Sequence, residues 1–367
     1  MRFYAKLVSN PNRLFLFDIG MGCEANEARM DAFEQQRFNR LENGEVKRHC
    51  PEFFTPCAGP MVKNGKDIHL AGDFIYWMPK IDNLVYAKEG LTLKDHQQNA
   101  ELGKPHEVSF RWRPGFKGEI GWNFGHGGWD MLFQYTRLYT SVSHHLRNAS
   151  FLPAFDAFAD GSYEDYFNQA DAHAYLHYQI GDLELGRNYY VSPTLKLRPF
   201  IGAKTTCQKQ NGKFDYNTDQ SAVESPSFFT RTKHYLWGVG MRGGVGTSWQ
   251  FSRYVGLYGD LALSGMWLHY KVGRKDTGVP PKSIEDQSLY SILNIQNRLR
   301  MIKPVMEFAC GVRAETYSRS GRYHFLIQAG WEGHTWMNQT LHITNKGEYS
   351  QSDLTVHGLT AKARVDF

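Results

Sequence analysis

Leu359-Thr-Ala-Lys-Ala-Arg-Val-Asp-Phe367, at the end of the sequence, alternates strictly between apolar and polar side chains. Successive side chains of a β-strand point to opposite faces, so this period of two predicts an amphipathic strand. A soluble sheet alternates in the same way, but an alternating strand with a terminal aromatic residue is typical of bacterial outer-membrane barrels. In such a barrel the apolar face meets lipid and the charged face lines a watery lumen.

Composition excludes a helical membrane span and permits a membrane barrel. The 367 residues are 41% hydrophobic with a mean hydropathy of −0.51, and no run approaches 18 apolar residues. Barrel strands escape this criterion because half of their side chains are polar. The aromatic content of 14% and the 35 glycines suit aromatic girdles and tight corners. The net charge of +5 is spread along the sequence, which gives no support for nucleic-acid binding.

The period of two recurs, with interruptions, from Ile68 to Phe367. The longest run, residues 107–124, places Val108, Phe110 and Trp112 on its apolar face and predicts one strand of about seventeen residues. Strands of soluble proteins usually have about 5–6 residues, whereas a tilted strand that crosses a bilayer is longer. A change of phase near Asp182 predicts a β-bulge.

We predict an all-β transmembrane antiparallel up-and-down barrel of about ten strands. Twelve strands stay open, because residues 78–105 or 288–300 could hold two more. Short corners alternate with long loops, as in outer-membrane barrels, whose periplasmic turns are short and extracellular loops long. The long loops are predicted at residues 141–170, 209–231, 273–298 and 335–351.

Residues 1–66 are predicted to form a leader, a periplasmic helix and a linker, and residues 67–367 the barrel. Apolar residues at roughly helical spacing predict the amphipathic helix over Glu24–Asn43, although a flexible lead-in is an equal alternative. Leu14-Phe-Leu-Phe17 is too short for the apolar core of a signal peptide, so we expect a different start or earlier processing. Cys50 and Cys57 are a candidate disulfide in an oxidising compartment, and two free thiols are the alternative.

Several short motifs, in order, resemble a known family. They are Gly72-Asp-Phe-Ile-Tyr-Trp77, Trp112-Arg-Pro-Gly-Phe-Lys117, Gly121-Trp-Asn-Phe124, Gly128-Trp-Asp130, Leu183-Glu-Leu-Gly-Arg187 and Leu197-Arg-Pro-Phe200. Over residues 66–367 the sequence resembles the Legionella-type pore-forming major outer membrane proteins, which also occur in chlamydia-related bacteria. The resemblance implies an integral outer-membrane porin of a Gram-negative bacterium without catalytic residues.

Charged residues on the polar faces are the candidates to line a pore. They are Arg111, Arg113, Lys117, Glu119, Asp130, Lys196, Arg198, Lys204, Arg242, Asp260, Glu307, Arg313, Glu332, Lys362 and Arg364. The slight basic excess predicts passive diffusion of small hydrophilic solutes and ions with a weak anion preference. The alternative is an internal lattice of salt bridges that seals the barrel, which would then act as a structural or adhesive protein through its long loops.

Aromatic residues are the candidates for the membrane interfaces: Trp112, Trp122, Trp129, Trp237, Trp267, Trp331 and Phe367. Besides outer-membrane lipid, the expected partners are the barrel-assembly machinery, through Phe367, and further copies of the chain in a homo-oligomer. We expect no metal and no cofactor.

Enzymatic function has little support in the sequence, which lacks the G-x-S-x-G, H-E-x-x-H and phosphate-loop motifs. The glycine-rich stretch 238–243 lies inside an alternating strand, where glycine makes room for neighbours. A hydrolase embedded in the barrel would find its nearest candidates in Ser143, His144 and His145.

Overall fold

The computed structural model describes residue 62 and residues 67–89, 104–124, 128–154, 167–192, 194–217, 227–252, 254–279, 290–344 and 348–367. The predicted helix 24–43 and the cysteine pair Cys50 and Cys57 lie outside these residues. Within them, no helix has the length and apolar character needed to cross a membrane.

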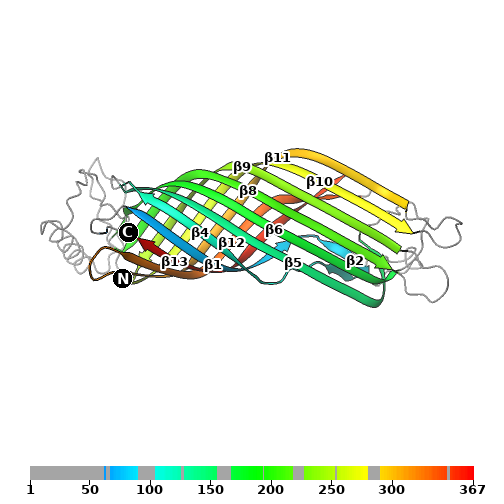
Figure 1. Ribbon diagram of the computed structural model, residues 1–367, viewed down its shortest axis with the longest axis horizontal. Helices are drawn as coiled ribbons and strands as arrows, with labels where there is room; N and C mark the ends of the chain where they lie inside the picture. Colours follow the sequence, from blue (N-terminus) through cyan, green and yellow to red (C-terminus); the bar gives the residue numbers. More distant parts are fainter. Residues whose placement is uncertain are drawn as a thin grey trace, which may run out of the picture. The chain divides into compact units, whose positions relative to one another are not determined.

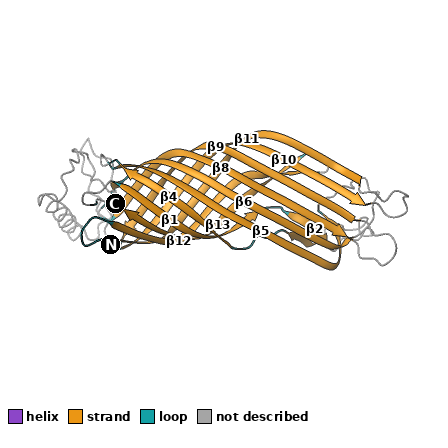
Figure 2. Cartoon of the chain, in the orientation of Figure 1, coloured by secondary structure: helices purple, strands orange, loops and turns teal. Residues whose placement is uncertain are grey.

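The described part of the chain contains ten long strands, which run side by side in Figures 1 and 2. They are β1 (Ile68–Ile81), β4 (Arg113–Asn123), β5 (Trp129–Pro153), β6 (Phe167–Arg187), β8 (Leu195–Asn217), β9 (Ser227–Gln250), β10 (Val255–Val279), β11 (Tyr290–Tyr317), β12 (His324–Ile343) and β13 (Tyr349–Asp366). Three short strands accompany them: β2 (Val85–Glu89), β3 (Lys104–Glu107) and β7 (Tyr189–Tyr190).

The long strands form one closed antiparallel barrel. From β8 to β13 each strand pairs with the next along the chain, and β1 pairs with both β13 and β4. The pairing of β5 with β6 closes the ring, so no long strand has a free edge. The predicted ten-stranded barrel is confirmed, and the alternative of twelve strands is wrong.

Connections at the two ends of the barrel differ in length. At the end that holds Ile68 and Asp366, the turns span residues 124–128, 188–194, 251–254 and 318–323. At the other end β1 and β4 are separated by residues 82–112, and β5 and β6 by residues 154–166. Since outer-membrane barrels have short periplasmic turns, we call the first end periplasmic and the second extracellular.

The predicted long loops are wrong in their extent, because the strands continue through most of them. β5 runs to Pro153, β8 to Asn217 and β10 to Val279, and β11 begins at Tyr290. Within the predicted loop 141–170, residues 141–153 and 167–170 are strand.

Inside these longer strands the polarity pattern inverts. In the periplasmic half of β10, Leu261, Leu263 and Trp267 point outward and are exposed. Beyond Trp267 the inward positions become apolar and buried, as at Leu268, while the outward positions become polar, as at Lys271. The strand keeps its alternation but exchanges which face is apolar.

The same inversion explains the change of phase near Asp182 in β6. Leu183 points outward and is exposed, whereas Ile180 points inward and is buried. The register of β6 with β8 runs without a shift from Gln169 to Gly186. The predicted β-bulge is therefore wrong: the apolar residues change face while the backbone remains regular.

The predicted seventeen-residue strand 107–124 is also wrong. Only Arg113–Asn123 belongs to β4, and residues 108–112 are not strand. Val108 and Phe110 are buried, with exposed fractions of 4% and 5%, and the Val108 amide donates to the Leu84 carbonyl at 2.9 Å. We call residues 84–89 and 104–110 the inward segment, because Leu84, Tyr86, Val108 and Phe110 pack inside the barrel.

Candidate pore lumen

The periplasmic half of the barrel interior is charged and contains a cavity of about 220 Å³. Its lining holds seven basic and seven acidic side chains from all parts of the barrel wall. The basic ones are Lys117, Lys196, Arg198, Arg242, Arg313, Lys362 and Arg364, and the acidic ones are Asp73, Glu119, Asp130, Glu184, Asp260, Glu307 and Glu332. Within each strand these residues are an even number of positions apart, so their side chains lie on one face. That face is the inward one, because it lines the cavity.

Most of the candidate pore residues lie at this cavity. Of the fifteen predicted, Lys204 is fully buried beside it, and Arg111 and Arg113 are exposed and outside its lining. Arg111 lies before β4, whereas Arg113 is the first residue of β4 and is in phase with Lys117, but at the end of the strand it is exposed. The sequence analysis missed Asp73 and Glu184, although both stand in phase with other inward residues.

Ion pairs join several strands along one side of this half of the lumen. Glu307 on β11 accepts from Lys204 on β8 at 2.6 Å and from Arg242 on β9 at 2.6 Å. Lys204 also pairs with Asp182 on β6 at 2.7 Å, and Arg242 reaches Glu184. One connected lattice thus links four strands.

Two further ion pairs lie nearer β1 and β4: Lys117 pairs with Glu332, and Lys362 with Glu119. Arg198 on β8 pairs with Glu184 at 2.7 Å and so joins the first lattice. It also donates to Asp130 on β5 through Nε at 3.0 Å and Nη2 at 2.6 Å, a two-pronged geometry that fixes the guanidinium. Because paired charges screen one another, the field in the cavity is weaker than fourteen separate charges would create.

Aromatic side chains form a belt where the charged half of the lumen ends. Trp77 and Trp336 are fully buried, and Trp336 donates from Nε1 to the Tyr178 hydroxyl at 2.9 Å. The Tyr178 hydroxyl lies 3.0 Å from Nδ1 of His334, whose Nε2 lies 2.8 Å from Glu332. The belt is thus hydrogen-bonded to the charged lattice.

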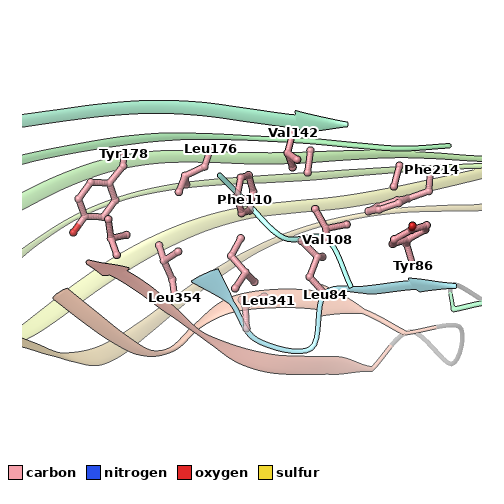
Figure 3. Close-up of a cluster of buried hydrophobic side chains, with 14 of the residues drawn as sticks. Leu84, Tyr86, Val108, Phe110, Val142, Leu176, Tyr178, Phe214, Leu341 and Leu354 are labelled. Atoms are coloured by element: carbon pink, nitrogen blue, oxygen red, sulfur yellow. The ribbon is translucent and has the colours of Figure 1, made fainter. Parts of the chain in front are cut away.

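The extracellular half of the lumen is filled with apolar side chains. Leu84, Tyr86, Val108 and Phe110 of the inward segment pack among residues of the barrel wall, including Val142, Leu176, Phe214, Leu341 and Leu354 (Figure 3). The Tyr216 hydroxyl donates to the Tyr86 carbonyl at 2.6 Å. This apolar cluster lies between the charged cavity and the extracellular end of the barrel.

The outer wall carries an apolar band bordered by aromatic residues. Trp122 and Trp129 lie near the periplasmic turns and are 52% and 41% exposed. Trp237, Trp267 and Trp331 lie toward the extracellular side of the band and are exposed. Trp112 stacks on Tyr76 at 5.6 Å and contacts Trp331 edge-on at 5.7 Å, and the Phe367 amide donates to the Ile68 carbonyl at 3.0 Å.

The histidines singled out for a hydrolase do not converge on one serine. The Ser143 hydroxyl lies 2.9 Å from Nδ1 of His173 on β6. His145 pairs instead with Asp171 at 2.7 Å, and Nε2 of His144 meets the backbone of Ser109. The glycine-rich stretch lies within β9, and a Cβ on Gly240 would stand 2.2 Å from the Gly265 carbonyl of β10.

A closed barrel with an exposed apolar band and a charged interior defines an integral β-barrel protein of the bacterial outer membrane. The family described as Legionella pneumophila major outer membrane protein precursor matches residues 60–367. Since the match covers most of the sequence, the chain belongs to this family.

Solved structures with a similar fold are remote in sequence. The outer membrane protease OmpT from Escherichia coli has 13% identity and a TM-score of 0.39, over 85% of this chain and 99% of that chain. The toluene transporter TodX from P. putida has 9% identity and a TM-score of 0.31, over 86% and 93%. A Pseudomonas aeruginosa FadL homologue has 8% identity and a TM-score of 0.27, over 82% and 89%. At these TM-scores the similarity indicates nothing about the function of this chain. No curated protein matches the sequence.

Proposed function

We propose that the protein is an outer-membrane porin for small hydrophilic solutes and ions, and that the described conformation is its closed state. The charged cavity inside the barrel carries this proposal, because ionisable side chains around a water-accessible space are what a polar diffusion path requires. The family description names an outer membrane protein and agrees with the location of such a path.

The inward segment is the element proposed to close the path. Its strand β2 pairs with the barrel wall only between Ala87–Glu89 and Phe151–Pro153 of β5. The ladder that closes the ten-stranded barrel does not include β2 or β3. Movement of the inward segment would therefore open the extracellular half of the lumen while the barrel stays intact.

The cavity lining gives no basis for strong ion selectivity. Its seven basic side chains are matched by seven acidic ones, so the basic excess of the whole sequence is not repeated there. The weak anion preference stays a prediction, and the proposal is for a pore that selects by size.

A sealed barrel that works as a structural or adhesive protein is the second candidate. The ion-pair lattice and the apolar cluster favour it, since together they fill much of the lumen with paired or packed side chains. In that case the extracellular loops would carry the function. For either candidate we propose a non-enzymatic protein; assembly through Phe367 and homo-oligomer formation stay predictions.

Single-channel recording separates the two candidates. The variants are Phe110→Asp, which places a charge in the apolar cluster, and Ser109→Asp, which adds the same charge at the exposed neighbouring position. Because burial of an unpaired carboxylate is unfavourable, the first variant should expel the inward segment. We expect frequent, larger conductance steps from Phe110→Asp, and rare brief openings from the wild type and Ser109→Asp.

The comparison requires that the wild type and both variants are folded barrels. The change in the gel mobility of each protein on heating checks this. If Phe110→Asp inserts into the bilayer and stays silent, the sealed barrel is correct. If Ser109→Asp opens as often as Phe110→Asp, the inward segment is not the closing element.

A further inference from the structure

Eight basic side chains gather on the outer wall just beyond the apolar band, on the neighbouring strands β8 to β11. A lower row, nearest the band, contains Lys209, Lys271, Arg298 and Arg300. An upper row contains Lys213, Arg231, Lys233 and Lys275. All eight are exposed, and we call them the basic surface.

The strand register makes these side chains neighbours. Tyr235 on β9 pairs with Lys209 of β8 on one side and with Lys271 of β10 on the other, and Lys271 pairs in turn with Arg298 of β11. Lys233 and Arg231 are the next two outward residues of β9 beyond Tyr235. Arg231 pairs with Lys213 of β8 and with Lys275 of β10. Directly paired side chains are about 5 Å apart at Cβ, so like charges here are close enough to repel.

Little on the described barrel wall neutralises this charge. Among the described outward positions of these strands beyond the apolar band, Asp215 is the one acidic residue, and it pairs with Lys213 at 2.7 Å. In the described part of the chain, the remaining seven basic residues form no ion pair with a carboxylate. Basic residues of the lumen, in contrast, are mostly paired.

The height of the basic surface matches the level of lipid headgroups. Outward residues of β9 are largely apolar from Trp249 to Trp237, about 40 Å along the strand, or roughly 28 Å across the membrane at a tilt near 45°. Lys233 and Arg231 lie four and six residues beyond Trp237. Lys209 and Lys271 flank the Tyr235 ring, with Nζ 5.7 and 5.9 Å from its centre.

We propose that the basic surface binds the phosphate groups of a phosphorylated, multiply acylated glycolipid of the outer leaflet. The lower row would hold phosphates next to the sugar, and the acyl chains would lie on the apolar band below Trp237. Lysine and arginine suit phosphate, and arginine binds two of its oxygens at once. A soluble polyanion would match the charge, but the position of the basic surface at the level of the headgroups, directly beside the apolar band, favours a membrane lipid.

Binding of purified lipopolysaccharide to the detergent-solubilised barrel tests this inference. The test variant is Lys209→Gln with Lys271→Gln, and the matched control is Arg319→Gln with Arg322→Gln, which removes the same charge from an exposed periplasmic turn. Each basic residue at an anionic membrane surface contributes about a fivefold change in affinity, so the test variant should bind about 30-fold more weakly. The control should bind like the wild type.

Dephosphorylated lipopolysaccharide and vesicles of phosphatidylglycerol identify what is recognised. We expect the wild type to lose most of its affinity for the dephosphorylated glycolipid and to bind phosphatidylglycerol more weakly than the intact one. Equal binding with and without phosphate, equal loss in the control variant, or equal binding of phosphatidylglycerol would each overturn the inference. Because no step needs an open lumen, the outcome is independent of the porin proposal.

Discussion

The pair Lys204 and Glu307 shows at the scale of single residues what holds the charged lumen together. The Lys204 side chain is fully buried between Asp182 and Glu307, and Glu307 also holds Arg242. Bringing such charges out of water is costly, and their mutual attraction offsets the cost only while every partner is present.

Glu307→Leu should therefore destabilise the barrel by about 3–5 kcal/mol, because it leaves Lys204 and Arg242 each with one carboxylate fewer. The double variant Lys204→Met with Glu307→Leu should recover part of this loss, since the lattice is again balanced in charge but Asp182 has lost Lys204. Urea unfolding in detergent micelles, followed by tryptophan fluorescence, measures both. A single variant that costs under about 1 kcal/mol would show that water screens this lattice.

At the scale of strands, the sequence predicted the number of long strands but not their length. Alternation identifies a strand whichever face is apolar, so β6 and β10 were located correctly. The extracellular ends of β5, β8 and β10 (residues 141–153, 209–217 and 273–279) fall in the predicted loops, because the prediction followed an apolar outward face. Beyond the hydrocarbon, the outward residues meet water and are polar, while the inward residues pack in the apolar cluster and are apolar. The apolar face of the strand therefore changes from the outside to the inside.

The inward segment was hidden for a related reason. Val108 and Phe110 alternate in phase with β4, and a period of two does not tell whether the chain is inside or outside the wall. The position of this stretch inside the wall is set by contacts that form only in the fold, such as the hydrogen bond from the Val108 amide to the Leu84 carbonyl.

Cysteine labelling tests the inversion along β10. In a variant with all five native cysteines replaced by serine, Lys271→Cys should react on intact cells with a maleimide that does not cross membranes. Leu263→Cys, outward within the band, and Leu268→Cys, inward beyond it, should stay unlabelled because lipid and packing shield them. Labelling of Leu263→Cys at the rate of Lys271→Cys would contradict the position of the band.

At the scale of the whole molecule, the balance of charge could not be predicted from the sequence. The chain carries a net charge of +5, whereas the cavity lining is balanced and the basic surface on the outer wall is not. The eight residues of the basic surface span positions 209 to 300 and look scattered in the sequence. Only the pairing of four strands brings them together.

Ion selectivity tests this balance in an open channel, for which the Phe110→Asp variant serves as the background. In that background the reversal potential in a potassium chloride gradient should lie near zero. Lys196→Gln should shift it toward cations and Asp260→Asn toward anions, because each removes one lining charge that has no ion pair within the described residues. Shifts of the same sign in both variants would contradict the assignment of the cavity as the conduction path.

The strand halves that continue past the bilayer carry the extracellular ends of the strands well above the membrane surface. From Trp267 to Val279, β10 climbs about 28 Å at a tilt near 45°. A peptide tag inserted beside Val279 should thus be accessible to an antibody on living cells, and the insertion should leave the membrane-embedded part of the barrel intact.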